Sequence, residues 1–278
     1  MTDLAKYVPQ LVLQHLTAHE ITYLTEVFTH FNGYPGLEEV WHLMDEQWIA
    51  HDCDPEQMDE RVAAFYQHPV WILNGLFIEQ HAQSLEYRRM FSDWVARQRP
   101  ARVADFGGGF GGLARFVGEA LPDAQVEVVD PYPHPAAIAV AAKTPNIRFV
   151  PELSGEYDVL IATDVFEHVP DPIGLAADTA EHLCVGGQYL IANCFRPVIL
   201  CHLPQHFHFN VAWDPAMKAM GLQPSERVSY GRVYRRQGID VDAARNIADC
   251  GRKLYPWIQR LPRGRERVGR LLMNWFCV

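Results

Sequence analysis

The sequence has no apolar run long enough to cross a bilayer as a helix. Its longest candidates, Leu183–Phe195 and Pro197–Trp213, are too short or too rich in His, Gln, Asn and Pro, whereas a spanning helix needs about 20 apolar residues. We also expect no secretory leader, because no small-residue cleavage site follows the short apolar run near the N-terminus. We therefore expect a cytoplasmic protein with no transmembrane segment.

Internal repeats, low-complexity segments and C-x-x-C pairs are absent as well. The 278 residues, 49% hydrophobic and 21% charged, have the composition of an ordinary globular protein with material for about two domains. The six cysteines lie far apart, which gives little support to a zinc knuckle or a disulfide scaffold. We expect them to be buried free thiols.

Positive charge is scarce, and much of it gathers near the C-terminus. The 24 Lys and Arg against 34 Asp and Glu leave a formal net charge of −10. Between Arg232 and Arg270, however, eleven basic residues stand against four acidic ones. An acidic body of this kind disfavours nucleic acid as a partner, and we expect a small molecule instead.

Residues 1–99 show only helical periodicity. In Ile21–Phe31 the apolar side chains recur on one helix face, and Asn32–Gly36 supplies a turn. Further helices are expected at Leu37–Ala50, Pro55–Tyr66 and Val70–Gln98. We therefore predict that residues 1–99 form a helical domain.

From residue 100 onward, short β-branched runs alternate with helical patterns. Strands are expected at Arg102–Phe106, Val126–Asp130, Ile147–Val150, Val159–Thr163, Gln188–Asn193, Gln223–Tyr230 and Arg232–Arg236. This alternation predicts βαβ units and an α/β fold with a mainly parallel sheet over residues 100–237. Residues 238–278 are expected to add a basic helical extension.

The strongest local signal is a glycine-rich segment after the first expected strand. Residues 103–112 read VADFGGGFGG, so a strand runs through five glycines into a helix. Glycines permit positive φ and close approach of a ligand, and the start of a helix offers free N–H groups and a positive dipole end. A nucleotide-like ligand is expected here, although Gly107, Gly109 and Gly112 also match the dinucleotide pattern G-x-G-x-x-G.

A carboxylate ends the next expected strand. Asp130 follows the run VEVV and lies nineteen residues after Gly111, where an acid can accept hydrogen bonds from both hydroxyls of a ribose. This spacing favours an adenosine-type ligand.

Together with three later segments, these residues resemble the class I S-adenosylmethionine (SAM)-dependent methyltransferases. The resemblance rests on V-x-D-x-G-x-G-x-G at Val103–Gly111, on Asp130 and on the segments YDVLIATDVFEHVPDP (157–172) and LCVGGQYLI (183–191). It continues through His206–Phe209 to Leu222 and covers about residues 100–235. It implies a Rossmann-like class I methyltransferase fold for that region. We expect the helices of residues 1–99 to form a lid over the ligand that carries substrate specificity.

The resemblance also implies that SAM is the cofactor. Gly107, Gly109 and Gly111 would let the loop reach the methionyl and ribose portions of SAM, while Asp105 would hold the loop or approach the methionyl amine.

Three further residues complete the implied cofactor site. Asp130 would bind the ribose, Tyr132 would lie against adenine, and the backbone near Asp164 would line the sulfonium end. Where family members often carry an acid after the third strand, this chain has only Glu152 in a short loop, so the contact to the adenine edge stays open.

The implied reaction transfers a methyl group to oxygen or nitrogen of a small-molecule acceptor or of a glycan or lipid precursor. The sulfonium already activates the methyl group, so alignment and desolvation are the main catalytic effects. A hydroxyl or protonated amine must also lose a proton, for which histidine is the natural base near neutral pH.

Four histidines follow the fourth and fifth expected strands, at positions 168, 202, 206 and 208. We expect His168 or His206 to be the catalytic base. His206 and His208 alternate in an apparently extended run and would point to opposite faces. We expect no metal ion, but Asp164–His168 is similar to an acid-x-x-Glu-His cluster of some metal-dependent methyltransferases, which keeps metal assistance as an alternative.

Three other functions stay open at this point. A SAM-consuming enzyme could cyclise or cleave the aminobutyl arm and release methylthioadenosine. A dehydrogenase fits the glycine pattern alone, and a SAM-binding regulator without catalysis fits the cofactor residues alone.

Overall fold

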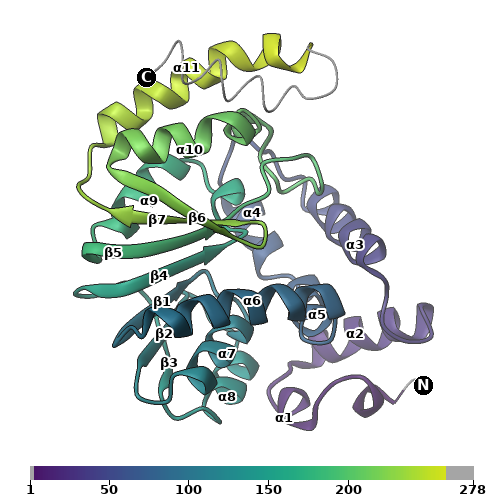
Figure 1. The fold of residues 1–278 in the computed structure, drawn as a ribbon. Coiled ribbons are helices and arrows are strands. Elements are labelled where there is room, and N and C mark those ends of the chain that lie inside the picture. The colour runs from purple at the N-terminus through teal and green to yellow at the C-terminus, as the bar shows by residue number, and fades with distance from the viewer. Residues whose placement is uncertain (1–2, 261–278) are drawn as a thin grey trace. The chain divides into compact units, whose positions relative to one another are not determined.

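Figure 1 shows the computed structural model of the protein, which describes residues 3–260. The chain divides into two units. The first unit comprises the chain up to residue 152 together with Ile199–Cys201, and the second comprises Leu153–Val198 and the chain from His202 onward.

Helices are the regular elements described before Arg102. They are η1 (Leu4–Lys6), α1 (Gln10–Leu13), α2 (Ala18–His30), α3 (Leu37–Ala50), α4 (Glu60–Tyr66), α5 (Val70–Ile78) and α6 (Ala82–Gln98). Local signals set several of their ends. Thr17 and Glu20 form a capping box at the start of α2, and Arg99 ends α6 in the left-handed conformation with a φ of 51°. The predicted helical character is confirmed for the described residues.

Two predicted helices have different limits in the structure. The helix expected over Val70–Gln98 is divided into α5 and α6, because the extended backbone of His81 interrupts it. The helix expected over Pro55–Tyr66 begins later, since Asp59 accepts a hydrogen bond from the amide of Arg61 and caps α4 there. Apolar periodicity does not contain these capping signals.

The first unit contains three parallel strands in the order β3-β2-β1. The strands are β1 (Arg102–Phe106), β2 (Gln125–Val129) and β3 (Ile147–Val150). Helix α7 (Gly112–Ala120) connects β1 to β2, and α8 (Pro135–Ala141) connects β2 to β3. This is the predicted βαβ pattern, with element limits shifted by at most a few residues.

A buried carboxylate links the three strands side by side. Glu127 on β2 is fully buried and accepts hydrogen bonds from Arg102 on β1 at 2.9 Å and from Nε of Arg148 on β3 at 2.7 Å. Gln125 donates to the same carboxylate at 2.8 Å. Because a buried charge is tolerated only when it is paired, these donors make an acidic residue compatible with the centre of the sheet.

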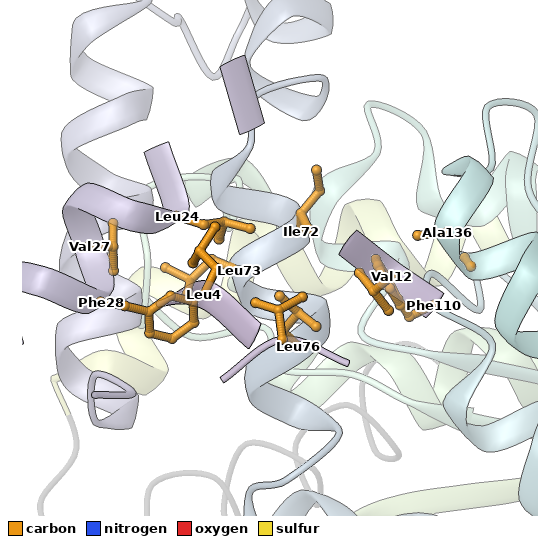
Figure 2. Packing of buried hydrophobic residues seen from close by; sticks show 12 residues of the cluster. Leu4, Val12, Leu24, Val27, Phe28, Ile72, Leu73, Leu76, Phe110 and Ala136 are labelled. Carbon is orange, nitrogen blue, oxygen red and sulfur yellow. The ribbon is translucent and has the colours of Figure 1, made fainter. Parts of the chain in front are cut away.

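One hydrophobic cluster joins the N-terminal helices to the βαβ part of the first unit. Figure 2 shows Leu24 and Phe28 of α2 and Leu73 and Leu76 of α5 in this cluster, which also includes Phe110 of the glycine-rich turn. Ala136 and Ala137 of α8 complete it. Burial of these apolar side chains is the main favourable contribution to packing, so η1, α1, α2 and α5 share a core with the glycine-rich turn and α8.

The second unit contains four strands in the order β4-β5-β7-β6. They are β4 (Tyr157–Thr163), β5 (Leu183–Ala192), β6 (Leu222–Val228) and β7 (Gly231–Arg236). β4 and β5 run parallel, whereas β7 is antiparallel to both of its neighbours. With the parallel strands of the first unit, this confirms the mainly parallel α/β class.

The helices of the second unit follow the same alternation. They are η2 (Phe166–His168), α9 (Pro172–Ala180), η3 (Pro204–His206), α10 (Phe209–Met220) and α11 (Val241–Gln259). α11 packs against α10 and α9. The rest of the predicted C-terminal extension, residues 261–278, lies outside the described residues.

The cysteines follow the prediction only in part. Cys53, Cys184, Cys194 and Cys201 are free thiols, of which Cys201 is fully buried. The prediction is wrong for Cys250, whose sulfur is disulfide-bonded, because spacing in the sequence does not show which sulfurs the fold brings together. Cys277 lies outside the described residues.

No helix in residues 3–260 is long and apolar enough to span a membrane.

The substitution Glu127→Ala is expected to lower the free energy of unfolding by about 2–3 kcal/mol, because it removes the shared acceptor of two arginines. Glu119→Ala, at an exposed position of α7, is the matched control and is expected to change it by less than about 0.5 kcal/mol. Urea denaturation measures both. Equal effects of the two substitutions would contradict a structural role for Glu127.

Candidate cofactor and acceptor sites

Three glycines in the left-handed region shape the turn after β1. Gly107, Gly109 and Gly111 have φ values of 69°, 53° and 69°, which other residues rarely adopt. The amide of Gly111 donates to the carbonyl of Gly108 at 2.8 Å. The turn leads directly into α7, whose first N–H groups have no side-chain cap. These N–H groups can therefore serve a ligand.

The fourth glycine of the turn is required by close packing. A Cβ atom at Gly108 would lie 2.6 Å from Oδ2 of Asp105 and 2.9 Å from the side chain of Val128. Any larger residue there would force the side chains of Asp105 and Val128 to move. Asp105 thus lies directly against the backbone of the turn at Gly108.

Burial leaves the carboxyl group of Asp105 without hydrogen-bond partners in the described residues. The side chain is 1% exposed, and both of its oxygens are buried without a partner. Burial raises the pKa of Asp105 to about 7, and the nearby charge of Arg88 opposes this only in part. A cation that approached the turn would convert this carboxyl to its charged form.

Asp130 and Tyr132 follow the carboxyl end of β2. The amide of Tyr132 donates to Oδ1 of Asp130 at 2.8 Å, and partial burial raises the pKa of Asp130. A cavity of about 370 Å³ opens beside Asp130 and is lined by Ile138 of α8 and Phe149 of β3. Tyr132 is 85% exposed and does not line this cavity. Ligands of parallel α/β sheets bind at such carboxyl ends.

Sequence reasoning missed the residues of α5 that hold the turn in place. A Cβ atom at Gly75 would lie 2.5 Å from the ring of Phe110, so the helix backbone and this ring are in direct contact. Glu79 forms an ion pair with Arg115 of α7. A glycine inside an apolar helical run was the only sequence signal for this close approach.

In the second unit, Asp164 ends β4 with an unusual backbone conformation. Its φ of 53° is rare for a residue with a side chain, and such conformations often occur at functional sites. Tyr230 in the β6–β7 turn donates its hydroxyl to Oδ2 of Asp164 at 2.8 Å. Sequence reasoning did not identify Tyr230, which is distant in sequence.

Glu167, His168 and His202 come together behind Asp164. Each offers one ligand atom, and these atoms lie within 4.8 Å of one another. The amide of Cys194 donates to Oε1 of Glu167 at 2.6 Å, while Oε2 is buried without a partner. Burial and the charge of Asp164 raise the pKa of Glu167.

The donor set of this cluster defines its possible chemistry. Nδ1 of His202 lies 2.8 Å from the carbonyl of Arg196, which fixes the orientation of this imidazole ring. One carboxylate and two imidazoles can share a proton, and they can also hold a divalent ion such as Mn, Fe or Zn. The metal-free site stays a prediction.

His206 and His208 do not form the extended run that the sequence suggested. His206 belongs to η3, which begins at Pro204, and His208 directly precedes α10 with helical backbone angles and no side-chain capping bond. A proline at the first position favours a helical turn over a strand. Nε2 of His206 lies 2.7 Å from the carbonyl of Val169, and burial lowers its pKa. Burial lowers the pKa of His208 to about 4.

Comparison with known proteins identifies this kind of domain. A family model described as a methyltransferase domain matches residues 78–219, just over half of the chain. A trans-aconitate 2-methyltransferase from Deinococcus radiodurans is 36% identical over 95 residues, which are 32% of this chain and 37% of that protein. A highly reducing polyketide synthase from Strobilurus tenacellus is 30% identical over 154 residues, 49% of this chain.

The chain thus spans only about a third of the first relative's length and 5% of the synthase. Among solved structures, an O-methyltransferase family protein from Burkholderia thailandensis matches with a TM-score of 0.50 and 16% identity. The match covers 72% of this chain and 71% of that one. At this identity the likeness supports the fold alone, which is the predicted one.

The raised pKa of Asp105 leads to a prediction for stability. The pKa of Asp105 is ~4 in the unfolded chain and about 7 in the folded protein. Between these two values the folded protein binds a proton that the unfolded chain does not, so the free energy of unfolding falls as pH rises through this window. The full loss is ~4 kcal/mol, about 1.4 per pKa unit. Asp105→Asn is expected to remove this loss, so urea denaturation at pH 5 and pH 8 should differ less than in the unsubstituted protein. The same pH dependence in both proteins would contradict the assignment.

Proposed function

The chain belongs to the methyltransferase-domain family, whose cofactor is SAM, and we propose that it transfers a methyl group from SAM to oxygen or nitrogen of a small molecule. The acceptor class includes small precursors of glycans or lipids. The observation that carries this proposal is the glycine-rich turn itself, with three left-handed glycines above the buried Asp105. Such a turn lets a ligand touch the backbone.

Within the first unit, the proposed contacts to SAM follow the geometry. Gly107, Gly109 and Gly111 are proposed to approach the methionyl and ribose portions of SAM. Asp105 would face the methionyl amine, because an ammonium group can donate hydrogen bonds to the buried carboxyl oxygens and favour their charged form. Asp130 is half-buried at the end of β2, a suitable place to accept hydrogen bonds from ribose hydroxyls.

Tyr132 and Asp164 are proposed to contact the adenine and the sulfonium end of the cofactor. Tyr132 is proposed to lie against adenine, which its 85% exposed ring would then cover. Asp164 is proposed to serve the sulfonium end through its backbone. Its left-handed conformation supports a functional role for this residue.

For proton removal we place His168 before His206. The ring of His168 is half-buried and lies against that of His202, with ring centroids 4.9 Å apart. His206 is 6% exposed, and one of its ring nitrogens is already occupied by the carbonyl of Val169. A base must reach the proton that it removes, which favours the more accessible imidazole.

The N-terminal helices are proposed to act as a lid that carries acceptor specificity. They share a hydrophobic cluster with Phe110, so a change in their position would move the glycine-rich turn. Methyl transfer needs alignment and exclusion of water more than it needs a protein nucleophile. A lid that packs against the glycine-rich turn would provide both alignment and exclusion of water.

The reaction is tested by incubating the full chain with methyl-labelled SAM and a cell extract, followed by mass spectrometry. We expect S-adenosylhomocysteine together with a compound that has gained a methyl group on oxygen or nitrogen. Methylthioadenosine without a methylated product would contradict methyl transfer and identify a SAM-cleaving enzyme. Binding of NAD but not of SAM would indicate a dehydrogenase instead.

The substitution Asp130→Ala is expected to weaken SAM binding about 10- to 100-fold, because a charged hydrogen bond contributes about 1.5–3 kcal/mol. Asp123→Ala, in the exposed turn before β2, is the control and is expected to leave the Kd for SAM within about twofold. Isothermal titration calorimetry measures both values. Unchanged affinity in Asp130→Ala would rule out its ribose role.

A further inference from the structure

The second unit contains a cavity that the cofactor assignments leave unused. Its volume is about 140 Å³, and residues from the end of β5, the start of α10 and the β6–β7 hairpin line it. Asn193 and Phe195 line it from the segment after β5, Trp213 from α10, and Arg232 from β7.

Four buried polar atoms on the wall of this cavity have no hydrogen-bond partner in the described residues. They are Nε of Arg232, Nε1 of Trp213, and Oδ1 and Nδ2 of Asn193. Buried polar groups in folded proteins are nearly always satisfied, so four such atoms around one cavity indicate a bound group that satisfies them. Three of the four are donors, which favours a ligand rich in acceptor oxygens.

The charge around the cavity is mainly positive, which also favours a ligand with acceptor oxygens. Three arginines line it, at positions 196, 227 and 232, against one acidic residue, Asp214. Asp214 is already engaged, since Tyr234 donates to its Oδ1 at 2.5 Å and Arg227 lies 3.8 Å from its Oδ2. Nε of Arg232 is buried without a hydrogen-bond partner within the described residues. A guanidinium group of this kind matches the two oxygens of a carboxylate or phosphate.

Aromatic rings form the apolar part of the wall. Phe195 and Phe209 lie with ring centroids 5.3 Å apart, and Trp213 lies 5.1 Å from Phe195 and 5.4 Å from Phe209. Such a surface suits a flat or hydrocarbon body attached to the anionic group. The cavity therefore combines an anion fork with an aromatic wall.

The cavity connects to the residues that we place at the reaction. Tyr230 lines it and donates its hydroxyl to Asp164 at 2.8 Å. We infer that this cavity binds the anionic end of the methyl acceptor, so the acceptor is a small organic acid or phosphate with an aromatic or apolar body. Arg232, Trp213 and Asn193 hold its oxygens. The identification of the ligand as the methyl acceptor rests on the proposed methyl transfer. The anion-binding site itself does not depend on that proposal.

The test uses benzoate, its neutral isostere benzamide, and inorganic phosphate as probes for the purified full chain, with binding followed by ligand-observed NMR at constant ionic strength. We expect saturable binding of benzoate or phosphate, and at least about tenfold weaker binding of benzamide. Phosphate binding without benzoate binding would identify a phosphate-bearing acceptor, and the reverse a carboxylate-bearing one. Absence of saturable binding by both anions would overturn the inference.

Arg232→Met is expected to weaken binding of the anion at least about tenfold. Arg235→Met is the matched control, because Arg235 is exposed on the same strand, contacts the carbonyl of Gly186 and does not line the cavity. It is expected to stay within about twofold. Equal effects of the two substitutions would overturn the assignment of Arg232.

A third variant keeps the inference testable if Arg232→Met does not fold. Trp213→Phe removes the indole N–H and keeps most of the aromatic wall, and it is expected to weaken anion binding about threefold or more. Unchanged affinity would remove Trp213 from the site. Asp130→Ala is expected to bind the anion as the unsubstituted protein does. The two proposals can fail separately. If the protein binds the anion but transfers no methyl group, the proposed function is contradicted and the anion-binding site is still supported.

Discussion

The close approach of the turn backbone to Asp105 is the constraint on which the first unit depends. Gly108 lies so near to the carboxyl group of Asp105 and to Val128 that a Cβ atom would overlap both. This contact brings the chain from β1 into α7 in a few residues, with three neighbouring glycines in the left-handed region. The same compactness buries the carboxyl oxygens of Asp105 without a hydrogen-bond partner in the described residues, so a ligand that donates hydrogen bonds to this carboxyl group is favoured there.

A second glycine contact extends this constraint to the N-terminal helices. Gly75 of α5 lies against the ring of Phe110, and that ring belongs to the cluster that also holds α2 and α8. The helices therefore belong to the structural support of the cofactor loop. If these helices also determine acceptor specificity, the same packed side chains serve that role and support the glycine-rich turn.

In the second unit, the polar groups left without partners mark the chemistry. Glu167 is buried with one free oxygen, and Arg232, Trp213 and Asn193 direct unsatisfied atoms to one cavity. Asp164 adds a backbone conformation that costs energy in a residue with a side chain. Proteins tolerate such features mainly where a ligand or a reaction compensates for them. Their concentration after β4 and β5 supports the placement of the acceptor there.

Local sequence determined the features that depend on neighbouring residues. The spacing of Gly107, Gly109 and Gly111, the acid at Asp130 and the alternation of strands and helices were all readable, because backbone conformation and strand ends follow short-range chemistry. The helix boundary at His81 and the short helix η3 at Pro204 were not predicted from the sequence. At these positions capping and proline, and not apolar periodicity, set the local structure.

Only the tertiary structure decided which distant residues meet. Glu127 is compatible with a buried strand because Arg102 and Arg148 reach it from neighbouring strands. Asn193, Trp213 and Arg232 share a cavity although no sequence pattern connects them. Sequence spacing carries information about conformation over a few residues, whereas burial, charge pairing and cavities arise only when packing brings separate elements together.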